Sequence, residues 1–408
     1  MIRHCLKLIW NRKRTNLLIM IEIFFSFLVV FAVVAMAAYY VNNYRRPLGF
    51  AWEDVWVVSI QTPVRMSPGR DDEAAREAVR ETMRQVDLAV REFQEVVDAA
   101  GSVTVPYAGF QWSSGVELNG RHYNYSLDGV TDRFNEVMGL QIVDGRWFSH
   151  EDDAAGWTPV VVNQRFARTL LGAERAVGRN VPQERPHAGE TQQEMRIVGV
   201  VSEFRQDGEL ADPENYVFTR HRLDRSDSEG ELNFLALKVR PGTTAAFEER
   251  LVRRMQAIAK DWSFEVRPLA DMRAARLRDT LRPLVIEAII GGFLMLMVAM
   301  GLTGVLWQTV TQRTREIGLR RAKGATIRDI QTQILGELVM MTTLALLLGA
   351  AIVVQFPLLK VFGFVSGGVY AASLVISALC IYLLTVVCAW YPSRMATRIQ
   401  PAEALHYE

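Results

Sequence analysis

Only one stretch of this sequence approaches the spacing of a ligand-binding loop. Gly318–Thr326 reads GLRRAKGAT and combines glycines with basic residues. A phosphate-binding loop follows a strand and ends in Gly-Lys-Ser or Gly-Lys-Thr, because its lysine and hydroxyl contact the phosphates and Mg²⁺. This stretch lacks that ending, and no strand is indicated before it. We therefore exclude a nucleotide site here.

Histidines and acid pairs likewise show no pattern of a catalytic or metal site. No Cys–His or Ser–His arrangement is apparent. The pairs Asp71-Asp72 and Asp152-Asp153 lie in turn-like surroundings, which favours solvated faces or helix starts. We expect no enzyme active site, no metal and no cofactor in this chain. The histidines lack metal-ligand spacing and are interpreted as solvated: His4, His122, His150, His187, His221 and His406.

Two acids inside apolar runs are more informative, because a carboxylate in a membrane is costly and usually faces a bundle interior or a cavity. Glu22 lies in the run 17–41, and Glu337 lies in the run 334–356. Glu337 follows an arginine-rich stretch closely. We favour an ion pair that ties this stretch to the bundle over a role in proton relay.

Four apolar runs are each long enough to cross a bilayer, which takes ~20 helical residues. The run 17–41 exceeds the ~7–15-residue apolar region of a signal peptide, so we interpret it as an uncleaved signal anchor. No polar stripe suited to a hydrophilic channel runs through these segments, which argues against a small-ion transporter. The other three runs are 284–310, 334–356 and 369–391.

Charge distribution predicts how these spans are oriented. The segment 311–329 contains six Lys or Arg residues against two acids and separates two spans, so the positive-inside rule places it in the cytoplasm. Residues 1–16 form an amphipathic surface helix or simply a positive flank, and 392–408 form a cytoplasmic tail. Residues 42–282 have net charge −6, in a chain of +1 overall, and are predicted to be exported. Nucleic-acid binding is disfavoured, because the basic residues outside the exported part lie beside spans.

The exported part predicts a mixed α+β domain. A helix is expected over 71–99, a strand over 103–108, and a hairpin over 112–130 around Asn119-Gly120, a strong turn signal. Strand–helix–strand patterns occur at both ends. We infer a platform made of 50–110 and 231–268, with a second part inserted at 111–230.

Several motifs in order resemble the MacB/FtsX-type permeases of ABC transporters, also called type VII or mechanotransmitting permeases. RTREIGLRRAKGATIRDIQTQILGE is similar to the family's segment between its second and third spans. The ending YPSRMATRIQPAEALHYE resembles the family's Pro-x-Glu-Ala-Leu tail. DGRWFSHEDD, PVVVNQRFARTLLGAERAVGRNV and MRIVGVVSEFR resemble the periplasmic core domain.

The resemblance implies a fold of four transmembrane helices, with a periplasmic domain of porter-like and sabre-like parts between helices 1 and 2. It implies a homo- or heterodimer of permeases in a bacterial inner membrane, bound to two copies of a separate ATPase that holds ATP and Mg²⁺. A periplasmic adaptor and an outer-membrane channel are possible further partners. The residues that match the family's ATPase-coupling segment are Arg315, Glu316, Gly318, Arg320, Gly324 and Ala325.

Two functions remain open at this point. The first is a permease subunit that couples ATP hydrolysis by the partner to export of a substrate. The alternative is transmission of force or a signal to a periplasmic partner without transport. Neighbouring genes for an adaptor and a channel would favour the first, and a hydrolase or sensor kinase the second.

Overall fold

The computed structural model describes residues 13–62, 73–118, 120–172, 175–183, 194–223, 232–312, 317, 319–320, 322–358 and 366–396. The chain divides into two compact units. One, here called the membrane unit, comprises Met1–Asn42 and Thr280–Glu408; the other, the outer unit, comprises Asn43–Asp279. The amphipathic segment expected over 1–16 and the tail 392–408 lie largely outside the described residues.

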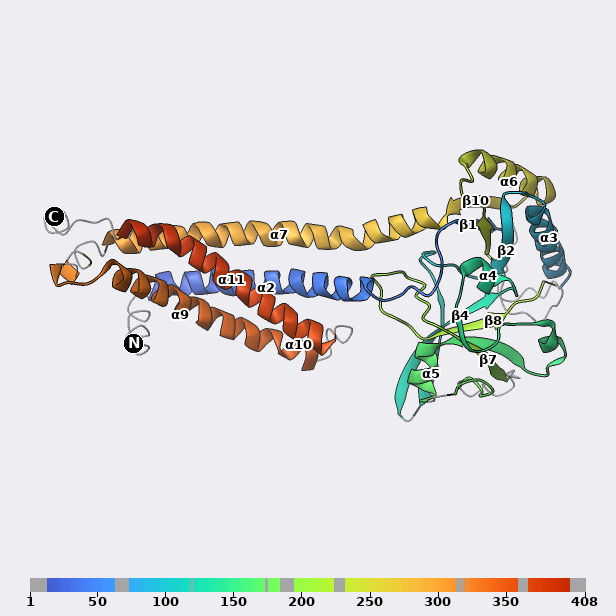
Figure 1. The fold of residues 1–408 in the computed structure, drawn as a ribbon, viewed down its shortest axis with the longest axis horizontal. Helices are drawn as coiled ribbons and strands as arrows, with labels where there is room; N and C mark the ends of the chain where they lie inside the picture. The colour runs from blue at the N-terminus through green and yellow to red at the C-terminus, as the bar shows by residue number, and fades with distance from the viewer. Residues whose placement is uncertain are drawn as a thin grey trace. The chain divides into compact units, whose positions relative to one another are not determined.

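Among the described residues, four helices are long and apolar enough to span a membrane, as predicted. Each contains a long apolar run, and Pro283 lies inside the second of them. The predicted spans lie within or nearly within these helices, which extend beyond them into polar sequence. The helices are α2 (Lys13–Tyr44), α7 (Leu269–Gln312), α9 (Ile327–Val353) and α11 (Gly367–Ala396), with the short α10 (Gln355–Leu358) after α9 (Figure 1).

Packing in the membrane unit uses small residues and hydroxyl pairs. A Cβ at Gly349 would lie 2.5 Å from the Phe27 ring, so α9 leaves room there for an aromatic side chain of α2. Between α9 and α11, the hydroxyl oxygens of Thr342 and Thr385 lie 3.2 Å apart. Such pairs satisfy polar side chains that lipid would leave without a partner.

The outer unit is built on a ten-stranded mixed sheet. Its order is β10-β1-β9-β2-β4-β8-β6-β7-β5, with β3 paired to β4. The predicted hairpin is confirmed, since β3 and β4 pair antiparallel from Leu118↔Arg121 to Trp112↔Leu127. The strands are β1 (Val55–Gln61), β2 (Val96–Ser102), β3 (Trp112–Leu118), β4 (Arg121–Val130), β5 (Ile142–Gly145), β6 (Thr158–Asn163), β7 (Met195–Val201), β8 (Tyr216–Arg220), β9 (Phe234–Val239) and β10 (Ser263–Pro268).

This sheet has two halves that meet at a narrow junction. Strands from both ends of the unit form β10-β1-β9-β2, and strands from the middle form β4-β8-β6-β7-β5. A single register pair, Ser102↔Val130, joins β2 to β4. The strands of the first half lie within 50–110 and 231–268, those of the second lie within 111–230, and all belong to one sheet. Their description as porter-like and sabre-like parts stays a prediction.

Helices cover both halves. The amphipathic faces of α3 (Glu73–Arg91) and α6 (Ala245–Ile258) pack on the first half, where Val86, Leu235 and Phe247 are buried (Figure 1). A second core, to which strands of both halves contribute, gathers aromatic residues such as Phe134, Phe204 and Phe218. The remaining short helices are α4 (Phe134–Met138), η1 (His150–Ala154) and α5 (Gln164–Leu170), which Asn163 caps by accepting from Phe166 N–H.

The predicted helix over 71–99 is too long, and the strand over 103–108 is wrong. Helix α3 ends at Arg91, and β2 begins at Val96. The apolar spacing continued at the helical period through Phe93 and Val97, but a turn closes there with Val96 N–H donating to Phe93 O at 3.1 Å. Val97 is then 63% exposed, so it belongs to no helical core face.

Candidate functional site

The segment between the second and third spans turns through a helix end built around Gly324. The described residues from 317 to 322 are helical. Ala325 N–H donates to Arg320 O at 3.0 Å, and Gly324 has φ +97°. This six-to-one bond with a left-handed residue is the Schellman arrangement, which favours glycine because it has no Cβ. The glycine therefore ends the helix sharply.

Helix α9 begins immediately afterwards with a capping box. The Thr326 hydroxyl accepts from Asp329 N–H at 3.3 Å, and the Asp329 carboxylate accepts from Thr326 N–H at 2.9 Å. Two free N–H groups of the first turn are thereby satisfied. Consecutive caps give this segment a defined shape although it is short and polar.

A line of polar side chains runs from this turn along α9. Arg320 donates to Gln333 Oε1 at 2.6 Å, and Gln333 donates to Glu337 Oε1 at 3.3 Å. Gln333 thus connects the basic segment to the intramembrane acid that the sequence singled out. The direct ion pair of Glu337 with an arginine stays a prediction. Sequence reasoning missed Gln333, although its spacing of four from Glu337 on a helix was a usable signal.

An apolar cluster packs against the same segment. Val310 at the end of α7, Ile317 and Ile330 are buried together, and Ile334 packs against them. The side chains come from both flanking helices and from the segment itself. The turn is therefore anchored to both spans by burial as well as by hydrogen bonds.

Exposure separates the expected coupling residues into two kinds. Gly324 is exposed, and so are its neighbours Lys323 and Leu319 (50% exposed), which were not among the expected coupling residues. Arg320 is only half-buried yet points to Gln333, so it supports the segment from within. Ala325 is half-buried beside it. Arg315, Glu316 and Gly318 lie outside the residues whose side chains are described.

The second intramembrane acid, Glu22, faces a glycine of α7. A Cβ built on Gly301 would lie 2.6 Å from Glu22 Oε2, so the carboxylate occupies the space that the missing side chain leaves. Glu22 thus faces the bundle interior, as expected of an acid in a span. The sequence indicated the acid but gave no sign of its neighbour.

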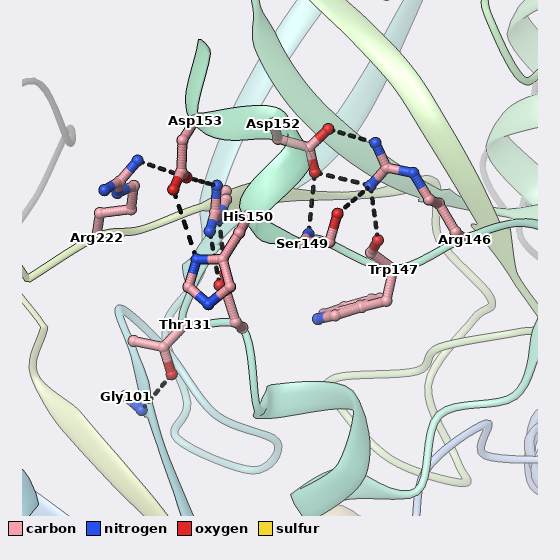
Figure 2. A network of polar contacts seen from close by, with 11 residues as sticks. Gly101, Thr131, Arg146, Trp147, Ser149, His150, Asp152, Asp153 and Arg222 are labelled. Atoms are coloured by element: carbon pink, nitrogen blue, oxygen red, sulfur yellow. Dashed lines mark hydrogen bonds and ion pairs between the residues drawn. The ribbon is translucent and has the colours of Figure 1, made fainter. Parts of the chain in front are cut away.

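The outer unit holds a network of ion pairs around η1, shown in Figure 2. Asp152 is buried, accepts from both terminal nitrogens of Arg146, and forms the capping box of η1 with Ser149. Asp153 accepts from Arg222 at 2.6 Å. The expectation of solvated acids is wrong for Asp152, but its place at a helix start is right. Among the described residues, no group of three His, Cys, Asp or Glu side chains could hold a metal ion.

Comparison with known proteins decides the family. The model of the MacB-like periplasmic core domain matches residues 17–254, and that of the FtsX-like permease C-terminal matches residues 288–401. The chain belongs to the MacB/FtsX-type family of ABC transporter permeases. Its periplasmic domain therefore lies between helix 1 and the later helices, as in the other MacB/FtsX-type permeases.

Curated relatives of this MacB/FtsX-type chain include two proteins named for export and one named as an ABC transporter permease. The macrolide export ATP-binding/permease protein MacB of Bdellovibrio bacteriovorus is 28% identical over 71% of this chain and 45% of its own length. The ABC transporter permease YknZ of Bacillus subtilis is 26% identical over 69% of this chain and 70% of its own. The pyoverdine export ATP-binding/permease protein PvdT of Pseudomonas aeruginosa is 23% identical over 69% and 42%. The chain spans about half the length of the first relatives it matches.

Solved structures similar to part of this chain include a periplasmic region and an extracellular domain. The periplasmic region of MacB from Actinobacillus actinomycetemcomitans is 12% identical, with TM-score 0.37, and the match covers 57% of this chain and 97% of that one. The extracellular domain of YknZ is 13% identical with TM-score 0.33, over 51% and 99%.

Proposed function

We propose that this chain is the permease subunit of an ABC transporter that docks a separate ATPase on 311–329 and couples ATP hydrolysis to movement of its periplasmic domain. The supporting observation is the shape of that segment. Two consecutive helix caps and the cluster of Val310, Ile317 and Ile330 hold a short turn between two spans, with Leu319 and Lys323 exposed on it. A shaped, partly apolar and basic turn suits docking of a soluble protein.

The proposed orientation follows from the same segment. Its surplus of Lys and Arg favours the cytoplasmic side of an inner membrane, with both termini on that side. Two permease copies, or this permease and a paralogue, would then present two such turns to an ATPase dimer. ATP and Mg²⁺ would be held by the ATPase.

Export is the function favoured for the complex. Two relatives are named for macrolide and pyoverdine export, and both are named as ATP-binding/permease proteins. A periplasmic adaptor and an outer-membrane channel would complete such a route. Force transmission to a periplasmic partner without transport is the competing outcome, which co-purified proteins distinguish.

The test uses the full chain purified from its own cells with its bound proteins. Leu319→Asp combined with Lys323→Glu changes the exposed residues of the turn without touching its caps. We expect at least about tenfold less co-purified ATPase, because a partner loses an apolar contact and meets a reversed charge.

Lys260→Glu is the matched control, since Lys260 is exposed in the outer unit and gives the same charge reversal. The Lys260→Glu variant should co-purify as much ATPase as wild type does. Equal ATPase in the double variant and wild type would refute docking at this turn. Absence of any ATPase from wild-type preparations would refute the proposed function as a whole.

A further inference from the structure

One loop of the outer unit contacts both segments that connect it to the spans. The boundary between the units falls inside α2 and α7, so Asn43 and Tyr44 of α2, and Leu269–Asp279 of α7, belong to the outer unit. Residues 202–212, in the connection from β7 to β8, contact both of these ends. We call this segment the 202–212 loop.

Arg205 binds the chain that leaves α2. Its guanidinium donates to Asn43 O at 2.8 Å and to Arg46 O at 3.3 Å. The other terminal nitrogen donates to Glu209 O at 2.6 Å and Ala211 O at 2.5 Å, within the loop itself. The side chain is 1% exposed. A planar fork of fixed donors therefore joins the end of α2 to the loop.

Asn43 and the backbone beyond it bind the loop in return. Asn43 donates through its side chain to Leu210 O at 3.2 Å, and Arg205 N–H donates to Leu48 O at 3.1 Å. Gly49, at φ +84°, lies so close that a Cβ there would be 1.3 Å from Glu203 O. Only glycine permits this backbone contact. The loop is thus fitted to the α2 side by backbone as well as side chains.

The acids of the same loop bind the first turns of α7. Glu209 is buried and accepts from Arg273 Nε and, at 3.4 Å, from the Tyr107 hydroxyl. Asp207 accepts from Arg276 at 2.8 Å. Arg205 donates to the Glu209 carbonyl and Arg273 to its carboxylate, so Glu209 connects the residue that binds the α2 side to the first turns of α7.

Apolar packing reinforces the α7 side. Leu269 and Met272 in the first turns of α7 are buried in the same core as Phe204 of the loop. Phe204 also lies 5.4 Å from the Phe50 ring, which follows the α2 segment. Arg273 stacks on the Trp52 ring at 4.4 Å. The contacts from the two segments therefore converge on one buried loop.

From this geometry we propose that the 202–212 loop is a rigid clamp that makes the end of α2 and the start of α7 move as one body. Arg205 and Glu209 are its positioning residues. In the proposed function, the clamp would pass movement of the spans to the periplasmic domain. Only this role rests on the proposed function; the clamp itself does not. A loop that merely fills the core would tolerate loosening on one side without loosening the other.

The test measures hydrogen exchange in the full chain held in lipid nanodiscs. Arg205→Met removes the guanidinium, with its donors to the α2 side and to the loop itself, and leaves a shorter, unbranched apolar side chain. We expect exchange to rise at least tenfold at residues 43–48 and also at 269–276, which Arg205 does not itself bind. Glu209→Gln weakens the contact with Arg273 and should raise exchange at 43–48 as well as at 269–276.

Arg220→Met is the matched control. Arg220 is another buried arginine of the outer unit, paired with Asp132 and Asp153, and both carboxylates lie outside the clamp. Its loss should raise exchange around those acids and leave 43–48 and 269–276 unchanged. If Arg205→Met does not fold, Asn43→Ala replaces it, because this substitution removes fewer hydrogen bonds on the α2 side.

Two outcomes overturn the clamp. One is local loosening only: hydrogen exchange rises at 43–48 alone in Arg205→Met (or Asn43→Ala), and at 269–276 alone in Glu209→Gln. The other is an equal rise at both places in Arg220→Met. The experiment needs no nucleotide, so it decides the clamp independently of the ATPase. Adding ATP to wild type with its co-purified ATPase then tests the proposed function, which fails if neither segment changes exchange.

Discussion

Two buried ionisable groups of the outer unit show opposite ways of placing charge inside a protein. Arg205 lies in the clamp and is surrounded by neutral carbonyl oxygens. Asp128 lies on β4 at the narrow junction of the two half-sheets, near Ser102↔Val130. A guanidinium stays charged at any physiological pH and offers five donors. A carboxyl group can lose its charge instead.

The surroundings of Asp128 favour that loss. Burial raises the pKa of Asp128 to about 8, although hydrogen bonds from Thr104 N–H and Val103 N–H act to lower it. Ser102 has a single hydroxyl proton and also contacts Thr104 O. If the Ser102 hydroxyl donates to Thr104 O, a protonated Asp128 can donate to the Ser102 oxygen. Each of these polar groups then has a hydrogen-bond partner. The junction is thus fully bonded with a neutral acid.

The contrast shows that the clamp is built for constant strength and the junction for dependence on pH. Every donor–acceptor bond of Arg205 described above persists across the pH range in which the fold survives. At the junction, raising the pH places a charge among groups that satisfy the neutral acid better. Four experiments can break or sharpen this contrast.

The largest effect is expected from Arg205→Met on stability. Removing the donors leaves several buried carbonyls without partners, at a cost on the order of 3–5 kcal/mol. Pulse proteolysis of the full chain in urea measures it. Arg220→Met should cost less, because Asp132 and Asp153 are about a third exposed and can turn to water. Equal losses would show that the clamp has no special stability.

Asp128→Asn should remove a pH dependence of several kcal/mol. The folded pKa lies above the unfolded value near 4, so the folded state holds the proton more tightly. Stability from this group is therefore full below pH 4 and falls as pH rises towards about 8. Between pH 5 and pH 8, the variant should gain on the order of 3 kcal/mol relative to wild type.

The difference between the two proteins isolates Asp128 from its neighbours. Burial also raises the pKa of Glu214, while its bond from Ser126 lowers it, and that group titrates in both proteins. Thermal unfolding of the full chain across this pH range gives the measurement. A difference between variant and wild type that stays constant with pH would show that Asp128 is ionised throughout.

A smaller effect distinguishes which way the Ser102 proton points. Ser102→Ala removes the acceptor of a neutral Asp128, so we expect a loss of about 1 kcal/mol at low pH. We also expect the pH at which this stability is lost, set by the pKa of Asp128 in the folded state, to move lower. The reason is that the neutral Asp128 loses its hydrogen-bond acceptor. Movement to higher pH would mean instead that Ser102 donates to the carboxylate.

Sequence patterns predicted the spans and the hairpin of β3 and β4, because apolar runs, alternation and the Asn-Gly turn signal act locally. They failed at residues 92–99, where an apolar spacing typical of a helix crosses a turn and continues into β2. They could not find the clamp, because Arg205 and Asn43 are 162 residues apart and neither spacing nor composition joins them. Glu337 was found through its cost in a membrane, while its link to Arg320 through Gln333 needed coordinates.

The smallest effect comes from the outer contact of the clamp. Asp207 and Arg276 have side chains about a third exposed, so water competes with their bond. Asp207→Asn should change stability by ~0–1 kcal/mol, and 0.5 M salt should remove most of that change. The Arg205→Met loss should survive the same salt, because its partners are uncharged and buried. If salt reduced the losses in Asp207→Asn and Arg205→Met equally, the strength of the clamp would lie in exposed ion pairs. The junction would then differ from the clamp as a buried acid differs from surface charge.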